Sequence, residues 1–437
     1  MSSALRPFGA AVVLLSIAPA LAPVVAAPRP HVPEMSWLDN GTIRLGADLA
    51  LGGAITWLSL SGSGENVINS HDWGRQVQMS YYSGPIPFIV GDKRPAKYWE
   101  GLGWNPIQAG DDFGHGSRVL EHRNDGRTIH VKCIPMQWPL DDVPGDCTFE
   151  SWLELDGAAV RARCRLTNAR ADRTQYPARG QELPAVYTNA PFHRIVTSTG
   201  AIEPKGPPEW TRWIAPEGWS ALVNDAGWGL GVWNPDCVRF TGGFSGKAGA
   251  GGAKDAPCGY LAPLRLEVLD HDIVHEYRYE LVLGTVEEIR AHVLARRSRG
   301  LPAWRFAADR QGWHYAHAAD AGWPIAGELA IHFTGDDPQL RSPSFHCRAE
   351  DAGVLVIDAA FRSAGKTAHV FWTTLADDAT SPDRSLSFAV NGDGEFREVR
   401  VPLADAPGWR GAITSLRLDP PGGAGDSVRV RAVRLER

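Results

Sequence analysis

The stretch FESWLELDGAAVRARCRL, residues 149–166, has the pattern of two strands joined by a tight turn. Apolar and polar side chains alternate on both sides of Asp156-Gly157, and a period of two residues is typical of half-buried strands. Asp-Gly is a favoured two-residue turn between antiparallel strands. The stretch therefore predicts a β-hairpin.

Similar short segments occur on both sides of this hairpin, separated by Gly, Asp and Asn turns. They cover residues 43–51, 54–60, 128–134, 220–223, 229–233, 264–268 and 275–283. Many short strands with no helices between them are typical of a sandwich or barrel and not of a βαβ enzyme. We expect an all-β fold, with one antiparallel unit over residues 28–284.

One helix is predicted directly after this unit. Thr285 can cap its first turn, with Glu288 three residues on as the capping-box partner. An apolar stripe follows, formed by Ile289, Val293 and Leu294. Because the composition of the chain changes here, we expect residues 285–302 to connect two domains.

The chain after this helix is again rich in strand patterns. They cover residues 353–361, 368–374, 384–390, 397–403, 413–418 and 428–435. About 130 residues of this kind suit a jelly-roll sandwich, so residues 303–437 are expected to form a second β domain. Such a module suits either carbohydrate binding or a structural role as a lid or spacer.

Residues 1–27 have the features of a signal peptide. Arg6 supplies a positive charge, residues 8–21 are apolar, and Val25-Ala26-Ala27 provide the small residues of a cleavage site. The apolar run is too short to span a bilayer. We expect a protein exported to the periplasm or the cell exterior, without a membrane anchor.

The six cysteines of an exported chain can form disulfides. Cys133 and Cys147 flank a short Pro-rich loop, and Cys237 and Cys258 flank a Gly-rich one. These two pairs are the expected bridges. The alternative is that some of the cysteines are small buried apolar residues.

Charge and ligand spacing restrict the possible partners. The net charge of −6 gives no electrostatic reason to expect nucleic acid or anionic membrane. No CxxC motif occurs, and His271 and His275 lie too far apart along a strand to share one ion. We therefore predict no metal and no cofactor, and make no prediction of oligomeric state.

Tryptophan is the most unusual part of the composition, with 17 residues in 437. Indole rings stack well on the C–H side of a sugar ring. So many of them, mixed with Gly, Asn, Gln and Tyr, favour a sugar-binding surface over core packing alone. Three polar, aromatic-rich segments stand out, at residues 69–82, 104–115 and 181–194.

GGAI at residues 52–55, NVIN at 66–69 and DWGR at 72–75 resemble the opening of the galactose-mutarotase-like superfamily. Residues 166–168 and the region of His193 are similar in position to a strand and a histidine of that family. The resemblance spans about residues 43–284. It implies an antiparallel supersandwich that binds sugar on its concave face, with Arg75 in contact with the sugar.

The family's histidine–aromatic–asparagine stretch is missing here, which puts anomeric epimerisation in doubt. The same scaffold also occurs in polysaccharide lyases and glycosidases, so the fold alone does not fix the reaction.

Hydrolysis of a glycosidic bond needs two carboxyl groups, one acid and one base or nucleophile. Glu182 is the preferred acid, because the apolar residues 183–186 follow it and desolvation would raise its pKa. A structural ion pair with an arginine such as Arg179 is the alternative. Asp111 is the preferred partner, with Asp142 next, and turn capping is the alternative for either.

His193 is the third predicted catalytic residue, and we expect it to meet Arg75, Asp111 and Glu182 in one cleft. The predicted substrate-binding residues are Arg75, Gln78, Tyr82, Trp104, Asn105 and Tyr187.

Together these features favour a secreted enzyme that hydrolyses glycosidic bonds in a poly- or oligosaccharide. β-Elimination on a uronate is the first alternative, with His115 or His193 and Tyr82 or Tyr187 as catalytic groups and Arg75 as the carboxylate partner. A sugar epimerase and a non-catalytic glycan-binding protein are the others.

Overall fold

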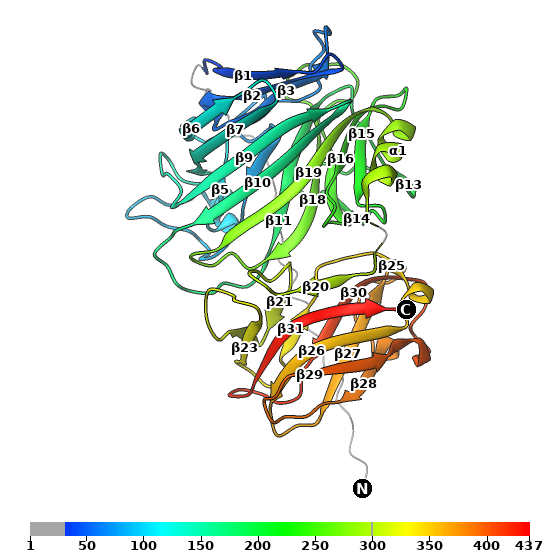
Figure 1. Cartoon of the computed structure of the whole chain (residues 1–437). Coiled ribbons are helices and arrows are strands. Elements are labelled where there is room, and N and C mark those ends of the chain that lie inside the picture. The colour runs from blue at the N-terminus through cyan, green and yellow to red at the C-terminus, as the bar shows by residue number, and fades with distance from the viewer. Residues whose placement is uncertain (1–30, 299) are drawn as a thin grey trace.

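The computed structural model of this protein describes residues 31–298 and 300–437. Figure 1 shows two β regions, one built from the first two thirds of the chain and the other from the last third. The strands pair antiparallel within several sheets. The all-β fold class is therefore confirmed.

The N-terminal region contains three sheets. The first has three strands, β1 (Met35–Asp39), β2 (Ile43–Asp48) and β3 (Ala54–Leu60). The second has nine, in the order β13 (Gly200–Ile202), β12 (Arg194–Thr197), β15 (Trp219–Val223), β16 (Trp228–Trp233), β19 (Val274–Thr285), β10 (Ala159–Asn168), β9 (Cys147–Asp156), β7 (Thr128–Ile134) and β6 (Arg118–Asn124). The third has seven, in the order β14 (Thr211–Ile214), β17 (Arg239–Ser245), β18 (Cys258–Glu267), β11 (Arg179–Asn189), β4 (Gln78–Ser80), β5 (Pro106–Ile107) and β8 (Met136–Gln137).

The predicted hairpin is the pair β9 and β10. Asp156 pairs with Ala159 across the turn, and Gly157 has a positive φ of 57°, which glycine adopts without steric cost. Residues of β9 alternate between buried and half-buried positions, and Phe149 and Leu153 enter the core. Alternating apolar residues therefore attach this hairpin to the hydrophobic core.

The core of the N-terminal region lies between the nine-stranded and seven-stranded sheets. Phe149 and Leu281 come from the first sheet, and Leu183, Val186 and Leu261 come from the second. All five are buried. This packing leaves the opposite face of the seven-stranded sheet free to form a site.

Helix α1 (Val286–Arg296) begins with the predicted capping box. The Thr285 side chain accepts from the Glu288 amide, and the Glu288 carboxylate accepts from the Thr285 amide. Ile289 and Val293 are buried against Trp219 and neighbouring residues of the nine-stranded sheet, whereas Leu294 is 37% exposed. The helix thus covers part of that sheet and joins β19 to the C-terminal region.

The C-terminal region is a sandwich of two sheets. One contains β22 (Ala318–Asp320), β23 (Leu329–Phe333), β31 (Ser427–Glu436), β26 (Val354–Arg362) and β29 (Arg397–Pro402), with β20 (Ala303–Arg305) paired to β31. The other contains β21 (His314–Ala316), β24 (Gln339–Arg341), β30 (Ala412–Asp419), β27 (Thr367–Thr374) and β28 (Ser385–Ala389), with β25 (Cys347–Arg348) paired to β30. Short 3₁₀ turns complete the chain at Leu49–Leu51, Lys97–Leu102 (η2), Ala349–Asp351, Pro382–Arg384 and Leu403–Asp405.

Arg310 joins the two regions. Its guanidinium donates to Asp270 of the N-terminal region at 2.8 Å and also to Asp320 of the C-terminal sandwich. Trp323 lies under this guanidinium, with 4.8 Å between the charge and the ring centroid. All three charged side chains are almost fully buried, so the pairing compensates for their desolvation.

The two expected disulfides are wrong, because all six cysteines are free and buried. Cys133 pairs with Phe149 across β7 and β9, so Cys147 is two positions out of register and only a diagonal neighbour. Diagonal neighbours are about 7–8 Å apart at Cα, beyond the usual disulfide range. Cys258 lies opposite Ser245 at one end of the β17–β18 pair, and Cys237 precedes the other end.

The predicted signal peptide, residues 1–27, lies outside the described residues. No helix within residues 31–298 or 300–437 is long and apolar enough to cross a membrane.

We predict that residues 303–437 fold without the rest of the chain. The hydrophobic core of the C-terminal sandwich is formed within this segment, by residues such as Trp313, Leu355, Trp372 and Val433. The expressed fragment should be soluble and should unfold in one cooperative thermal transition, measured by circular dichroism beside the full chain. An insoluble fragment, or gradual unfolding, would show that the boundary is misplaced.

Candidate active site

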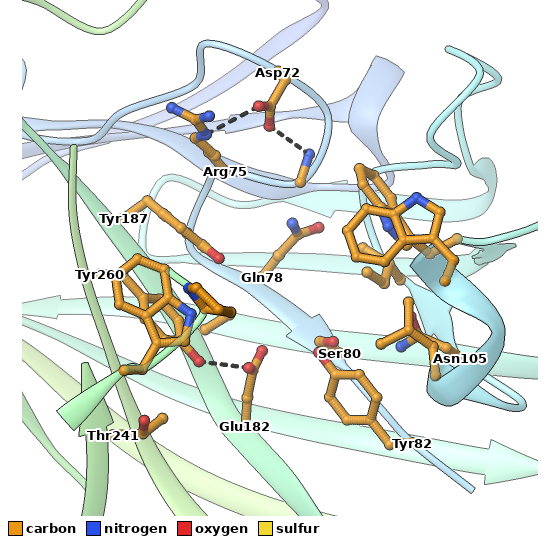
Figure 2. A pocket seen from close by; sticks show the side chains of 18 of the residues that line it. Asp72, Arg75, Gln78, Ser80, Tyr82, Asn105, Glu182, Tyr187, Thr241 and Tyr260 are labelled. Atoms are coloured by element: carbon orange, nitrogen blue, oxygen red, sulfur yellow. Dashed lines mark hydrogen bonds and ion pairs between the residues drawn. The ribbon is translucent and has the colours of Figure 1, made fainter. Parts of the chain in front are cut away.

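A cavity of about 280 Å³ opens on the face of the seven-stranded sheet opposite the core. Every strand of that sheet except β8 contributes a lining side chain, and residues next to the strands, such as Trp138 and Trp210, complete the walls. The lining residues are Asp72, Gly74, Arg75, Gln78, Ser80, Tyr82, Trp99, Leu102, Asn105, Ile107, Trp138, Glu182, Ala185, Tyr187, Pro208, Glu209, Trp210, Arg212, Thr241 and Tyr260. Figure 2 shows most of these side chains around the cavity, with Gln78 near its middle.

Strand β4 separates core from cavity by simple alternation. Val77 and Met79 are buried in the core, whereas Gln78 and Ser80 line the cavity. Successive side chains of a strand point to opposite faces of the sheet.

Strand β11 carries Glu182 into the cavity by means of a β-bulge. Leu183 and Val186 belong to the core, while Glu182, Ala185 and Tyr187 line the cavity. In a regular strand, Glu182 and Val186 would share one face. The register shifts between Glu182 and Ala185 against β4, and an extra residue of this kind re-aims a side chain. The bulge therefore turns the carboxylate away from the core.

Glu182 is 9% exposed, and its carboxyl lies beside the hydroxyls of Tyr260 and Tyr82. The Tyr260 hydroxyl donates to its Oε1 at 2.5 Å (Figure 2). Burial raises the pKa of Glu182 above its ordinary value of 4.5, and the hydroxyls of Tyr260 and Tyr82 reduce the shift. The carboxyl therefore holds its proton to higher pH than an exposed glutamate does.

The surrounding tyrosines are neutral hydrogen-bond donors and acceptors. Burial, and then the nearby Glu182 charge, raise the pKa values of Tyr82, Tyr187 and Tyr260 well above the ordinary value of 10.0. The Tyr187 and Tyr260 rings pack at a centroid distance of 4.9 Å. They form a firm aromatic wall beside the carboxyl.

Arg75 lies on the far side of Gln78 from Glu182 (Figure 2). Its Nε is 2.9 Å from Asp72 Oδ2, and its Nη1 donates to the Ala256 carbonyl. Asp72 also accepts from the Gly74 amide at 3.0 Å. Much of the charge of Arg75 is thus already balanced by the protein.

Two amide side chains are fixed in the cavity lining. Gln78 accepts from the Ala109 amide at 3.0 Å, and Asn105 donates from Nδ2 to the Tyr81 carbonyl at 2.8 Å. The Asn105 contact orients its amide group, so Oδ1 is the remaining polar atom. Both side chains are placed before any ligand binds.

Tryptophans form the outer walls. Trp99 of η2 and Trp138, which follows β8, meet edge to face at a centroid distance of 6.0 Å. The Trp99 indole donates to Asp112 at 2.8 Å. Trp210 packs on Tyr260 at 5.0 Å on another wall. These rings give the cavity the stacking surfaces that sugar binding uses.

The structure brings together six of the nine predicted site residues. Those that line the cavity are Arg75, Gln78, Tyr82, Asn105, Glu182 and Tyr187. Asp111, His193 and Trp104 are outside its lining, so the expected meeting of Arg75, Asp111, Glu182 and His193 in one cleft is not found.

Asp111 is fully buried in a loop, where its oxygens accept from the amides of Phe113, His115 and Asp142 and from the His115 ring. These contacts fix the loop, in line with the turn-capping alternative. Asp141 also approaches the His115 ring, and the three side chains could together ligate a metal ion. The four hydrogen bonds account for the position of Asp111 without one.

His193 and Trp104 also have contacts of their own. His193 contacts the Pro191 carbonyl at 3.1 Å and Asp225 at 3.4 Å. Trp104 is 0% exposed in the core, where its indole donates to Asp146 at 2.8 Å. A buried indole with a hydrogen-bond partner is a packing residue, so the prediction that Trp104 binds substrate in this cavity is wrong.

The sequence reasoning missed four aromatic lining residues, Trp99, Trp138, Trp210 and Tyr260. The excess of tryptophan signalled such a surface but not its members. Tyr260 lies on β18, which begins six residues before the strand predicted at residues 264–268.

No protein-family model matches this chain, and no curated protein matches it. Similar solved structures include a galactose mutarotase-like protein from Lactobacillus casei, with 12% identity, a TM-score of 0.39, and coverage of 57% of this chain and 100% of that one. Another, from Clostridium acetobutylicum, has 8% identity, a TM-score of 0.35, and coverage of 57% and 95%. A 4-alpha-glucanotransferase from Thermococcus litoralis has 12% identity, a TM-score of 0.31, and coverage of 59% and 40%.

The first two are galactose mutarotase-like proteins, and residues 43–284 resemble that superfamily in sequence. At TM-scores below 0.5, these similarities carry no argument about activity.

We predict that the stability of the protein depends on the ionisation of Glu182. Because folding raises this pKa, wild type should lose stability relative to Glu182→Gln as pH rises from about 4 through the folded pKa, and the difference should then level off. Thermal unfolding of both proteins between about pH 4 and pH 8 measures this difference. Glu65→Gln, at an exposed position, is the control and should follow wild type. A difference that does not change with pH would contradict the prediction.

Proposed function

We propose that this protein is a carbohydrate-active enzyme that cleaves glycosidic bonds, with Glu182 as the general acid. One observation carries the proposal: a buried carboxyl of raised pKa, held by a tyrosine hydroxyl, lies in a cavity with tryptophan walls. A carboxyl whose pKa is raised keeps its proton to higher pH and can donate it to a leaving group.

In the proposed reaction, Glu182 gives its proton to the bridging oxygen as the bond from that oxygen to the anomeric carbon breaks. A water oxygen bonds to the anomeric carbon, and its proton goes to a second carboxylate. The other carboxyl groups in the cavity lining are Asp72 and Glu209. They replace Asp111 as candidates for the second group.

Hydrolysis is favoured over β-elimination by the state of the other groups. Elimination needs a base such as a tyrosinate, and burial raises the pKa values of Tyr82, Tyr187 and Tyr260. It also needs a group that neutralises the uronate carboxylate, and Arg75 is already paired with Asp72. Neutral tyrosines beside a glutamate of raised pKa suit acid catalysis better.

Export remains part of the proposal. The features of residues 1–27 would place the enzyme in the periplasm or outside the cell, where polymeric glycans are accessible. The C-terminal sandwich would then be an accessory module, with carbohydrate binding or a spacer role as its two possible functions.

We predict that Glu182→Gln lowers turnover by at least about 100-fold while sugar binding is retained, because glutamine keeps the shape but supplies no acidic proton. The purified full chain is incubated with neutral and acidic glycans, and reducing ends and the ultraviolet absorbance of unsaturated uronates are both recorded. New reducing ends without that absorbance indicate hydrolysis, and its appearance indicates elimination.

Asp72→Asn and Glu209→Gln test the second carboxyl in the same assay. Glu65→Gln is again the control. Full activity of Glu182→Gln would remove this residue from the mechanism, and glycan binding without any product would favour a binding protein.

A further inference from the structure

Most aromatic residues of the cavity form two separate groups, one that extends from β11 toward β14 and one on the β8 side of β11 in the order of the sheet. Tyr187 and Tyr260 pack with Trp210 on the side of β18 and β14. Trp99 and Trp138 pack together on the side of β5 and β8. Glu182, on β11, lies between the two groups.

Both groups are held in place by the protein itself. Trp99 is hydrogen-bonded to Asp112 and packs on Trp138. Trp210 packs on Tyr260, which in turn is hydrogen-bonded to Glu182. A platform that is fixed before binding costs little entropy when a sugar ring stacks on it.

Several buried polar atoms of the lining have no hydrogen-bond partner among the described residues, including Oγ of Ser80 and one further atom beside each aromatic group. On the Trp138 side it is Oδ1 of Asn105, a residue that is 1% exposed. On the Tyr260 side it is Nε1 of Trp210. Buried polar atoms nearly always have partners, so an unpaired one in a cavity lining points to a ligand. The first can accept a hydrogen bond from a sugar hydroxyl, and the second can donate one.

From these observations we infer that the cavity has two sugar subsites, one on each side of Glu182, and that its substrate is a chain of at least two sugar units. One unit stacks near Trp138 and bonds to Asn105, and the next lies against Trp210 and Tyr260. The bond between the two units then lies at the Glu182 carboxyl. This inference rests on the proposed function for the cleavage step, but not for binding.

The test measures binding of sugar ladders to the full-length Glu182→Gln variant by calorimetry. The probes are the one- to four-unit members of the glucose, mannose, galactose and galacturonate series. In the series that binds, the disaccharide should bind at least about tenfold more tightly than the monosaccharide, a difference of about 1.4 kcal/mol.

Trp138→Ala and Trp210→Ala should each weaken disaccharide binding by about tenfold, since each removes one stacking surface. A monosaccharide occupies one subsite, so one of the two substitutions should leave its affinity unchanged. Trp152→Ala is the matched control. Trp152 is half-buried and stacks on His130 outside the cavity lining. Its loss should therefore leave the affinities for both the monosaccharide and the disaccharide unchanged.

Trp138→Phe and Trp210→Phe keep most of the packing, and they replace the alanine variants if those do not fold. Equal affinity for monosaccharide and disaccharide, or weakening by only one of the two substitutions, would overturn the inference. If Glu182 is needed for turnover but affinity does not rise with chain length, the proposed function stands and the two-subsite inference fails. If affinity rises with length but no product forms, the subsites stand and the proposed function fails.

Discussion

The alternation of side chains along a strand is the constraint on which this structure depends, and the bulge in β11 is where the constraint is relieved. The seven-stranded sheet must present apolar residues to the core on one face and polar and aromatic residues to the cavity on the other. Leu183 and Val186 pack in the hydrophobic core, and Ala185 and Tyr187 line the cavity. Only the irregular register after Glu182 lets the carboxyl join the cavity face, where burial raises its pKa.

The regular parts of the fold could be predicted because their signals are local. The strands at 54–60 and 128–134 have the bounds that alternation alone indicated, and the capping box of α1 has both of its hydrogen bonds. In these elements the residue pattern and the tertiary contacts require the same conformation. Strand β11 was not predicted as a strand, since Pro184 and the bulge interrupt its alternation.

The site was harder to predict because tertiary packing decides which similar residues face the cavity. Trp99 and Trp104 are five positions apart, yet one lines the cavity and the other lies in the core. Asp111 and Glu182 are both buried acids. The first is surrounded by backbone amides and the second by tyrosine hydroxyls, so only the second faces the cavity. Composition identified three segments that contribute to the cavity, but it missed the segments of Trp99, Trp138, Trp210 and Tyr260 and could not assign the direction of each side chain.

The six free cysteines have a consequence for how the chain is handled, by a cell or at the bench. All are buried thiols, so the native state derives its stability from packing and hydrogen bonds and has no need of an oxidant. A reducing cytosol is therefore a suitable host for production, and reductant should not harm the folded protein. Non-native disulfide formation is a risk before folding is complete, while the thiols are still exposed. Six exposed thiols in an oxidising compartment can join in non-native pairs, so rapid folding is what protects them.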